Sequence, residues 1–154
     1  MDDEIEKAIK EKCLKLLALR EHSQRELINK LSAKGYPVSA IEVIVEQLAE
    51  QGWQNDQRFA ESYARQRIVK GCGPIRIQYE LRQKGVENFN LNIVMEETGK
   101  NWSDILEELY FQKYNGNKSL TRSEWAKRSR FLQQRGFPNE MVMNLFKQLA
   151  VKFD

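Results

Sequence analysis

Three segments of this sequence repeat one pattern around a glycine: LINKLSAKGYP (27–37), IRIQYELRQKGV (75–86) and RFLQQRGFP (130–138). In each segment a leucine lies four residues before the glycine, a cation lies directly before it, and an apolar residue follows it. The glycines lie 50 and 51 residues apart. Self-similarity at such a period is typical of tandem repeats, so the sequence predicts three structural repeats of about 50 residues.

The repeated glycine has the position of a residue that ends a helix. Helices commonly end at a residue in the left-handed conformation, which glycine adopts without a steric penalty from a Cβ atom. The preceding cation then lies at the negative end of the helix dipole. The following apolar residue can pack back onto the last turn. The pattern therefore predicts helix C-caps at Gly35, Gly85 and Gly136.

Apolar residues follow a helical spacing over nearly the whole chain, and the period-two alternation of β-strands is almost absent. One helical stripe, for example, consists of Ile41, Ile44, Val45 and Leu48. The sequence therefore predicts an all-α fold with three helices in each repeat. The expected helices span 3–19, 23–34, 39–51, 55–70, 74–84, 88–98, 102–114, 122–134 and 138–152.

Three hydroxyl residues are followed, three positions later, by a glutamate. This is the spacing of a capping box, in which the hydroxyl accepts a hydrogen bond from a free backbone N–H of the first turn. The glutamate carboxylate accepts in return from the backbone N–H of the capping residue. The expected boxes are Ser23 with Glu26, Ser39 with Glu42, and Thr121 with Glu124.

The composition argues against several classes of site. Hydrophobic residues make up 41% and charged residues 31%, as in folded soluble proteins. No apolar run reaches the roughly 20 residues that span a membrane, and two distant cysteines favour a reducing cytoplasm. The single histidine, His22, expected in the turn before Ser23, leaves little basis for zinc or triad chemistry. We therefore expect no catalytic residue, metal site or cofactor.

We expect all three tryptophans to anchor the core: Trp53, Trp102 and Trp125.

The segment KGCGPIRIQYELRQKG (70–85) looks like a phosphate-binding loop only at first sight. It lacks the lysine and hydroxyl residue that follow the second glycine of such a loop, and no apolar strand precedes it. Gly71 has the position of a helix end, and Pro74 suits the first position of the next helix. The segment therefore predicts a corner between the fourth and fifth helices. This corner is expected to gather three cations into a patch: Arg67, Lys70 and Arg76.

Positive charge is unevenly distributed. The net charge is −2 for residues 1–53, +2 for 54–100 and +3 for 101–154. Such local excess is typical of proteins that bind polyanions or acidic partners, although each single cation can equally belong to a solvated face. The helical wheel places Arg67 among apolar positions, from which its head either reaches solvent or projects toward a partner. The candidate binding residues are Arg58, Arg65, Arg67, Lys70, Arg76, Arg82, Lys84, Lys127, Arg128 and Arg130.

Three segments together resemble the RecX family of bacterial regulatory proteins: LALREHSQRELINKL (17–31), NDQRFAESYARQRIVKGCGPIRIQYELRQKGV (55–86) and RFLQQRGF (130–137). The resemblance covers essentially the whole chain, and its middle segment is the most specific. One difference is Asn55, where the family often has a second acidic residue. The resemblance implies three tandem three-helix repeats in an elongated, curved array. We place the repeats at 1–53, 54–100 and 101–154.

The resemblance also implies a function. RecX proteins bind the RecA recombinase and its filament on DNA. They modulate, and usually inhibit, filament growth, strand exchange, ATP hydrolysis and coprotease activity, in homologous recombination, DNA repair and the SOS response. We therefore expect a non-enzymatic, cytoplasmic, monomeric regulator with weak, salt-sensitive affinity for single- or double-stranded DNA. Two alternatives stay open: a stand-alone helix-turn-helix-like DNA-binding module, and a Mg²⁺-dependent nuclease, which no ligand spacing supports.

Overall fold

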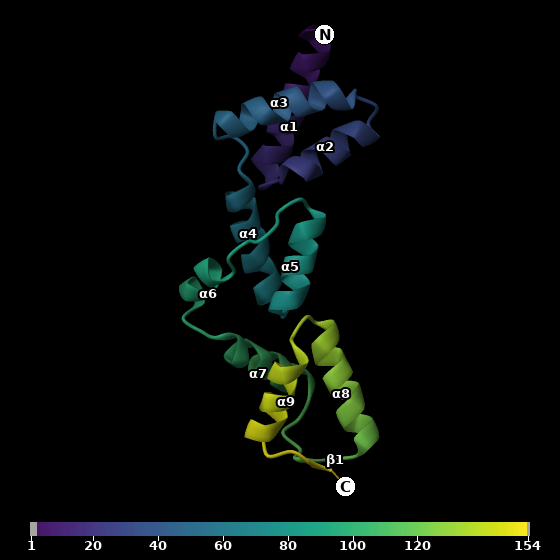
Figure 1. Cartoon of the computed structure of the whole chain (residues 1–154), viewed down its shortest axis with the longest axis vertical. Coiled ribbons are helices and arrows are strands. Elements are labelled where there is room, and N and C mark those ends of the chain that lie inside the picture. The colour runs from purple at the N-terminus through teal and green to yellow at the C-terminus, as the bar shows by residue number, and fades with distance from the viewer. Residues whose placement is uncertain (1–2, 154) are drawn as a thin grey trace. The chain divides into compact units, whose positions relative to one another are not determined.

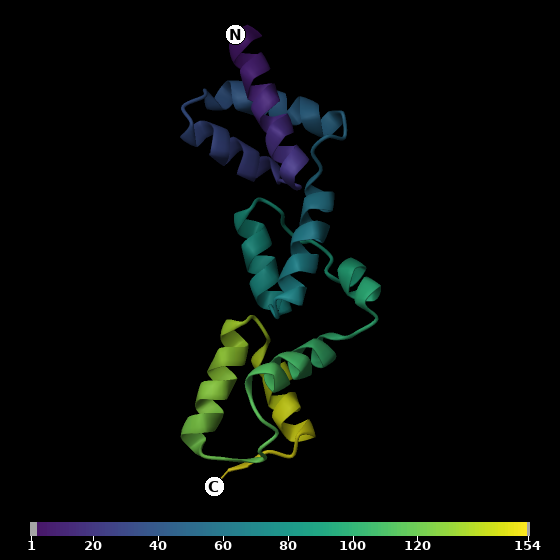
Figure 2. The same cartoon turned by 180° about the vertical axis from the view of Figure 1, so that it is seen from behind.

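The structure is a computed structural model that describes residues 3–153 of the chain. These residues form nine α-helices and two very short strands (Figure 1, Figure 2), so the predicted all-α fold with three-helix repeats is confirmed. The elements are α1 (Asp3–Leu19), α2 (Gln24–Ala33), α3 (Val38–Glu50), α4 (Asp56–Val69), α5 (Pro74–Gln83), α6 (Asn92–Thr98), α7 (Trp102–Lys113), β1 (Ser119–Leu120), α8 (Arg122–Gln134), α9 (Asn139–Gln148) and β2 (Lys152–Phe153).

The chain divides into two compact units. Unit 1 consists of the chain up to Tyr63 together with Leu81–Phe89. Unit 2 consists of Ala64–Glu80 together with the chain from Asn90 onward. The first two boundaries along the chain, after Tyr63 and after Glu80, fall inside helices. Helices α4 and α5 therefore contribute residues to both units. The repeat boundaries at 53/54 and 100/101 stay a prediction.

Unit 1 contains a three-helix core. Helix α1 crosses α3 and packs against both α2 and α3 (Figure 1). The predicted stripe of α3 is buried at all four positions and faces buried residues of α1 and α2. The buried cluster is Ile9, Cys13, Leu27, Leu31, Ala40, Ile41, Ile44, Val45 and Leu48.

Unit 2 contains a second core, built by α7, α8 and α9. Tyr110 of α7 is 1% exposed and meets Phe146 of α9 edge to face, with ring centroids 5.8 Å apart. Leu132 of α8 is also fully buried. The remaining buried residues of these helices are Ile105, Leu106, Leu109, Ser129, Val142 and Leu145.

The three predicted glycine caps are confirmed. Gly35, Gly85 and Gly136 have φ angles of 94°, 86° and 102°, in the left-handed region. In each cap the apolar residue after the glycine donates its N–H to the carbonyl of the repeated leucine, as Val86 does to Leu81 at 2.9 Å. This bond pattern is the Schellman motif, which satisfies carbonyls that a helix end leaves free. The spacing of leucine, glycine and apolar residue is therefore set by backbone hydrogen bonding.

The capping predictions are partly right. The boxes of Ser23 with Glu26 and of Thr121 with Glu124 are present. The box predicted at Ser39 is wrong, because α3 begins at Val38 and Ser39 lies within its first turn. Its N-cap is a proline, whose side chain has no oxygen to accept a hydrogen bond. A capping box that the sequence reading missed joins Asn101 to Asp104 at the start of α7.

Most predicted helix ends agree with the observed ones within one residue, but two predicted helices, 88–98 and 138–152, extend clearly beyond the observed ones. Helix α6 begins at Asn92 rather than near residue 88, because Asn88 has a φ of 57° and interrupts the helical path. Helix α9 ends at Gln148, and Ala150 also has a positive φ, of 54°. The chain then runs as β2, which pairs in parallel with β1 through Ser119 and Lys152. Apolar spacing could not reveal these strands, since each has only two residues.

The tryptophans behave differently from one another. Trp53 is 60% exposed, so its assignment as a core anchor is wrong. Trp102 and Trp125 are half-buried and pack against Phe137 and Phe146, with centroids 6.3 and 6.0 Å apart. Trp53 follows the left-handed Gly52 after α3, the position at which Val86 and Phe137 are buried in two other caps, so its apolar character alone did not reveal its exposure.

Candidate partner-binding surface

The segment between α4 and α5 is a corner, as predicted, and it is also a contact with the cap of α8. Gly71 has a φ of 81° at the end of α4. Gly73 donates its N–H to the carbonyl of Arg135 at 2.7 Å, and Ile75 donates to the carbonyl of Gly136 at 3.0 Å. Protein carbonyls thus occupy N–H groups that a phosphate-binding loop would offer to its ligand. The corner is not a nucleotide site.

Arg135, which was not among the predicted site residues, holds this corner from the other side. Its Nε donates to the carbonyl of Gly71 at 3.3 Å, and its Nη2 donates to the carbonyl of Lys70. A cation at these carbonyls is favourable because they form the negative end of the α4 dipole. The sequence predicts Arg135 only as the cation at the end of its own helix. Its second role depends on residues 64 and 65 positions away, for which the local sequence carries no signal.

Two of the predicted cations at the corner meet through a glutamate. Arg67 forms a bidentate pair with Glu80, with Nε–Oε1 and Nη2–Oε2 distances of 3.0 and 3.2 Å. Both side chains are about four-fifths buried, at 19% and 20% exposure. Arg76 approaches the same carboxylate at 3.8 Å and donates to the carbonyl of Gln134 at 3.5 Å. Glu80 therefore neutralises part of the charge that the sequence reading assigned to a patch.

Arg58 of α4 is tied to the end of α3. Its Nε lies 2.6 Å from Oε1 of Glu21, and its two Nη atoms donate to the carbonyls of Gly52 and Trp53 at 3.1–3.2 Å. These bonds satisfy carbonyls beyond the helix end. Arg58 thus fixes the connection between α3 and α4 within unit 1, a structural role that the sequence reading did not assign.

The next three predicted residues differ in their surroundings. Arg65 forms a bidentate pair with Glu97, at 2.7 and 2.8 Å, and this hydrogen bonding lowers the pKa of Glu97. Lys70 and Arg82 are exposed. Within residues 3–153, neither of these two side chains has an ion pair or a hydrogen bond to its charged head. Lys70 and Arg82 therefore retain their donors for a partner.

In the third repeat, Arg128 is built into an aromatic cluster. Its Nη1 donates to the hydroxyl of Tyr110 at 2.8 Å, and its Cζ lies 4.5 Å from the ring centroid of Tyr114. A guanidinium over an aromatic face is held by the ring quadrupole. Lys127 and Arg130, on the same helix, are exposed, with no side-chain bond to the part of the chain that the structure describes. Of the three predicted cations on this helix, Lys127 and Arg130 are therefore the two whose charged heads are exposed.

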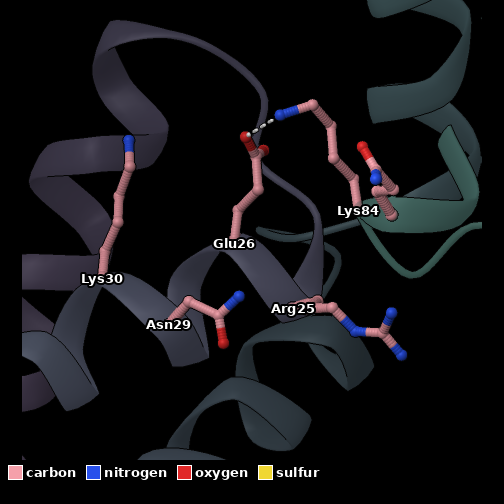
Figure 3. Close-up of a pocket in the computed structure, with 6 residues that line it drawn as sticks. Arg25, Glu26, Asn29, Lys30 and Lys84 are labelled. Carbon is pink, nitrogen blue, oxygen red and sulfur yellow. Dashed lines mark hydrogen bonds and ion pairs between the residues drawn. The ribbon is translucent and has the colours of Figure 1, made fainter. Parts of the chain in front are cut away.

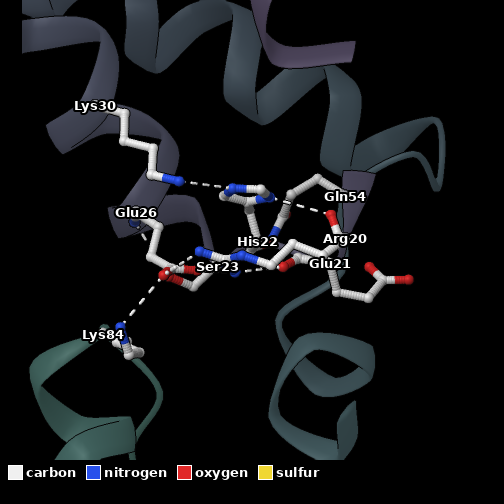
Figure 4. Close-up of polar contacts among 8 residues, drawn as sticks. All are labelled: Arg20, Glu21, His22, Ser23, Glu26, Lys30, Gln54 and Lys84. Carbon is white, nitrogen blue, oxygen red and sulfur yellow. Dashed lines mark hydrogen bonds and ion pairs between the residues drawn. The ribbon is translucent and has the colours of Figure 1, made fainter. Parts of the chain in front are cut away.

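Lys84 belongs to a polar network in unit 1 that Figure 4 shows. Its Nζ lies 3.3 Å from Oε2 of Glu26 and 5.4 Å from the ring centroid of Tyr63. Glu26 also pairs with Arg20 at 3.0–3.1 Å and accepts from the N–H of Ser23 at 3.1 Å. Burial raises the pKa of Glu26, but the bonds from Arg20 and Ser23 outweigh burial and lower it to about 2.

His22 completes the network. It lies in the turn before Ser23, as predicted, but it is 1% exposed. Its Nδ1 lies 3.1 Å from the carbonyl of Arg20, and its Nε2 lies 2.9 Å from Nζ of Lys30. Because Lys30 donates, the imidazole is neutral with its proton on Nδ1. Burial lowers the pKa of His22 below its ordinary value, which agrees with this neutral form.

A hollow of about 270 Å³ lies beside this network, with α2 and the end of α5 as its walls. Figure 3 shows Glu26 and Lys84 facing each other, with Arg25 and Lys30 on either side along α2. Of the residues that line the hollow, only Lys84 is among the predicted binding residues. The full lining is Arg25, Glu26, Asn29, Lys30, Gln83 and Lys84.

Within residues 3–153, no group of three or more His, Cys, Asp or Glu side chains is placed to hold a metal ion. The free cysteines Cys13 and Cys72 are buried, and burial raises the pKa of Cys13 to about 11. No helix in the described part of the chain has the length and apolar character to span a membrane.

Comparisons with known proteins agree with the repeat architecture. The family descriptions of RecX match in three parts: the first three-helix domain at residues 10–48, the second at 55–92 and the third at 103–146. The crystal structure of RecX from Lactobacillus salivarius aligns with a TM-score of 0.72 at 19% identity, covering 97% of this chain and 99% of that one. A crystal structure of regulatory protein RecX aligns with a TM-score of 0.73 at 22% identity, covering 94% and 72%. These structures support the fold.

Sequence relatives support the family. Regulatory protein RecX of Pseudomonas syringae pv. tomato is 36% identical over 138 residues, which are 90% of this chain and 89% of that protein. Regulatory protein RecX of Halorhodospira halophila is 36% identical over 135 residues, which are 88% and 84% of the two chains. With three repeats, their glycine caps and this coverage in agreement, the chain belongs to the RecX family of regulatory proteins.

Proposed function

We propose that this chain is a non-enzymatic, cytoplasmic regulator that binds RecA and its filament on DNA and inhibits filament growth, strand exchange, ATP hydrolysis and coprotease activity. The observation that carries the proposal is the family match, which extends over 90% of the chain and includes all three repeats. The resemblance to RecX proteins supplies the identity of the partner.

The distribution of charged groups supports a binding role. Three exposed cations of unit 2, Lys70, Lys127 and Arg130, retain free donors within the described residues. Cations of this kind suit a polyanionic or acidic partner. Tandem helical repeats, in turn, offer an extended surface of the kind that binds large partners.

A stand-alone helix-turn-helix function has less support. In such domains the first residues of the recognition helix contact base edges in the major groove. The N–H of Ile75, in the first turn of α5, donates to Gly136, and Arg76 is shared between Glu80 and a carbonyl. The start of α5 is thus in contact with protein rather than available to bases.

The test is the ATPase activity of RecA on single-stranded DNA, measured with increasing amounts of this protein. DNA is kept in excess, so that simple coating of DNA cannot produce the effect. We expect the rate to fall with the ratio of this protein to RecA. An unchanged rate at every ratio, together with no binding to RecA–DNA filaments in a sedimentation assay, would contradict the proposal.

A further inference from the structure

The hollow in unit 1 has the donor groups of an anion receptor. Its lining contains three cations, two amides and one carboxylate, and none of the six is an apolar residue. Protein partners are usually anchored by tryptophan, tyrosine and arginine in desolvated pockets, and of these the lining offers only Arg25. Lysine, arginine, asparagine and glutamine are instead the side chains that commonly contact the phosphates of DNA.

The one carboxylate of the hollow does not neutralise it. Glu26 already pairs with Arg20 and accepts from Ser23, in addition to its contact with Lys84. Arg25 has a single hydrogen bond among the described residues, a long one of 3.4 Å to the carbonyl of Arg82. A guanidinium carries five N–H donors in a fork that matches phosphate oxygens. Most of the donors of Arg25 are therefore left for a ligand.

Lys30 is crowded by positive charge. Burial and the neighbouring cations Arg20, Lys84 and Lys34 lower its pKa, and Glu26 only partly opposes them. One N–H of its ammonium points to His22, which leaves two for another acceptor. An anion in the hollow would relieve the repulsion among these cations and use their free donors.

We propose that this hollow binds a phosphodiester group of a DNA strand through Arg25, Asn29, Lys30 and Lys84. Two further exposed residues are near the hollow: the charge of Lys34 acts on Lys30, and the backbone carbonyl of Arg82 accepts from Arg25. The inference deepens the proposed function and rests on it, by giving the regulator its own contact with the DNA of the filament.

The sharpest test is Asn29→Asp, which adds one negative charge at nearly constant shape to an exposed residue of the lining. Its matched control is Gln47→Glu, the same change on an exposed residue of α3 outside the hollow. Binding to labelled oligothymidylate is measured without RecA across about 50–200 mM salt. We expect Asn29→Asp to weaken binding about fivefold or more at low salt, and the control less than about twofold. Equal affinity of the two variants would overturn the proposal.

A second pair of variants removes charge instead. Arg25→Gln/Lys30→Gln keeps an amide that can donate to His22, and its control Lys10→Gln/Lys15→Gln removes two exposed charges from α1. Salt dependence is the slope of the logarithm of the binding constant against the logarithm of the salt concentration. We expect only the first double variant to reduce the magnitude of this slope, by about 1 per lost phosphate contact. Circular dichroism checks that both variants are folded.

Inorganic phosphate and oligothymidylate are titrated separately in NMR experiments on backbone amides of α2. Chemical-shift changes that the oligonucleotide causes in the original protein but not in Asn29→Asp would support the proposal. Chemical-shift changes caused by inorganic phosphate but not by the oligonucleotide would overturn it. Because no RecA is present, these results are independent of the ATPase test. Unchanged DNA binding by Asn29→Asp with retained RecA inhibition would refute the hollow without refuting the regulator.

Discussion

Gly73 lies so close to Gly136 that a Cβ atom at Gly73 would be 2.5 Å from the carbonyl carbon and oxygen of Gly136. The contact joins the corner before α5 to the cap after α8, two segments that the sequence analysis found separately. The absence of a side chain at Gly73 lets its N–H reach the carbonyl of Arg135 at 2.7 Å. The close approach of the two backbones explains why a glycine is needed at this position.

Gly73→Ala is expected to destabilise the protein. The added methyl group meets backbone atoms that cannot move without breaking the contact, so overpacking should cost about 1–3 kcal/mol in the free energy of unfolding. Chemical denaturation followed by circular dichroism measures it. The control is Gly116→Ala, because a Cβ there meets only Phe111, at 3.8 Å. A stability of Gly73→Ala equal to that of Gly116→Ala would show that the corner and the cap are not held together.

Gly85→Val is expected to be harmful for a different reason. Gly85 has a φ of 86°, which a β-branched residue adopts only with strain, and an added Cβ would lie 3.1 Å from Cβ of Arg25. We expect a loss of about 2 kcal/mol or more in unfolding free energy. Gly35→Asn provides the control, since Gly35 is left-handed with open space around it and asparagine tolerates that conformation. The prediction fails if both variants melt at the same temperature.

The exposed cations of unit 2 are expected to matter for RecA and little for stability. Lys70→Glu/Lys127→Glu/Arg130→Glu reverses three charges that have no partner within residues 3–153. Stability should change by about 0.5 kcal/mol or less per site, while inhibition of the RecA ATPase should weaken markedly. The control is Lys7→Glu/Lys10→Glu/Lys15→Glu, with the same change of charge on α1. Equal loss of inhibition in both triple variants would indicate a bulk charge effect.

Reversing the charges of the corner cations is expected, by contrast, to destabilise the fold. If all three cations of the predicted patch, Arg67, Lys70 and Arg76, were exposed, reversing their charges together would leave the fold intact. The structure argues otherwise, because Arg67 and Arg76 share Glu80 and two glutamates in their place would repel it. We expect this variant to lose about 1–3 kcal/mol of unfolding free energy, since it leaves the largely buried carboxylate of Glu80 without its donors. Denaturation of the single variant Arg67→Glu is the simplest measurement.

Glu26 should give the protein a specific dependence on pH. Its pKa falls from 4.5 to about 2 on folding, so the folded state prefers the charged form. The stabilisation is present above about pH 4.5 and is lost as the pH falls through the folded pKa. Glu26→Gln should therefore be less stable than the original protein at pH 7, and the difference should shrink between pH 4.5 and 2. A difference that stays constant over this range would show that Glu26 does not titrate with a lowered pKa.

Much of the local structure could be predicted because its causes lie within a few residues. The leucine, glycine and apolar residue of each cap form their Schellman bonds across six positions, as Leu81 and Val86 do. Apolar stripes reveal a buried helix face in the same way. The errors arose where a neighbouring residue overrode the pattern, as Pro37 does at the start of α3 and Asn88 does before α6.

The candidate binding surface could be predicted only as a set of cations. Whether a cation is available depends on the carboxylate or carbonyl beside it, and these partners are distant in sequence. Glu26 meets Lys84 across 58 positions and Arg65 meets Glu97 across 32. Helical spacing along one segment contains no information about such pairs.

The sequence by itself therefore determined the three repeats, their helices and their caps, because backbone hydrogen bonds and apolar periodicity are local. Only the tertiary structure decided that Gly73 packs on Gly136, that Arg67 is neutralised by Glu80, and that Arg25 and Lys30 line one hollow with Lys84. These relationships arise when segments far apart in the chain meet. The chemistry at a point of contact is then set by both segments together, and neither one contains it alone.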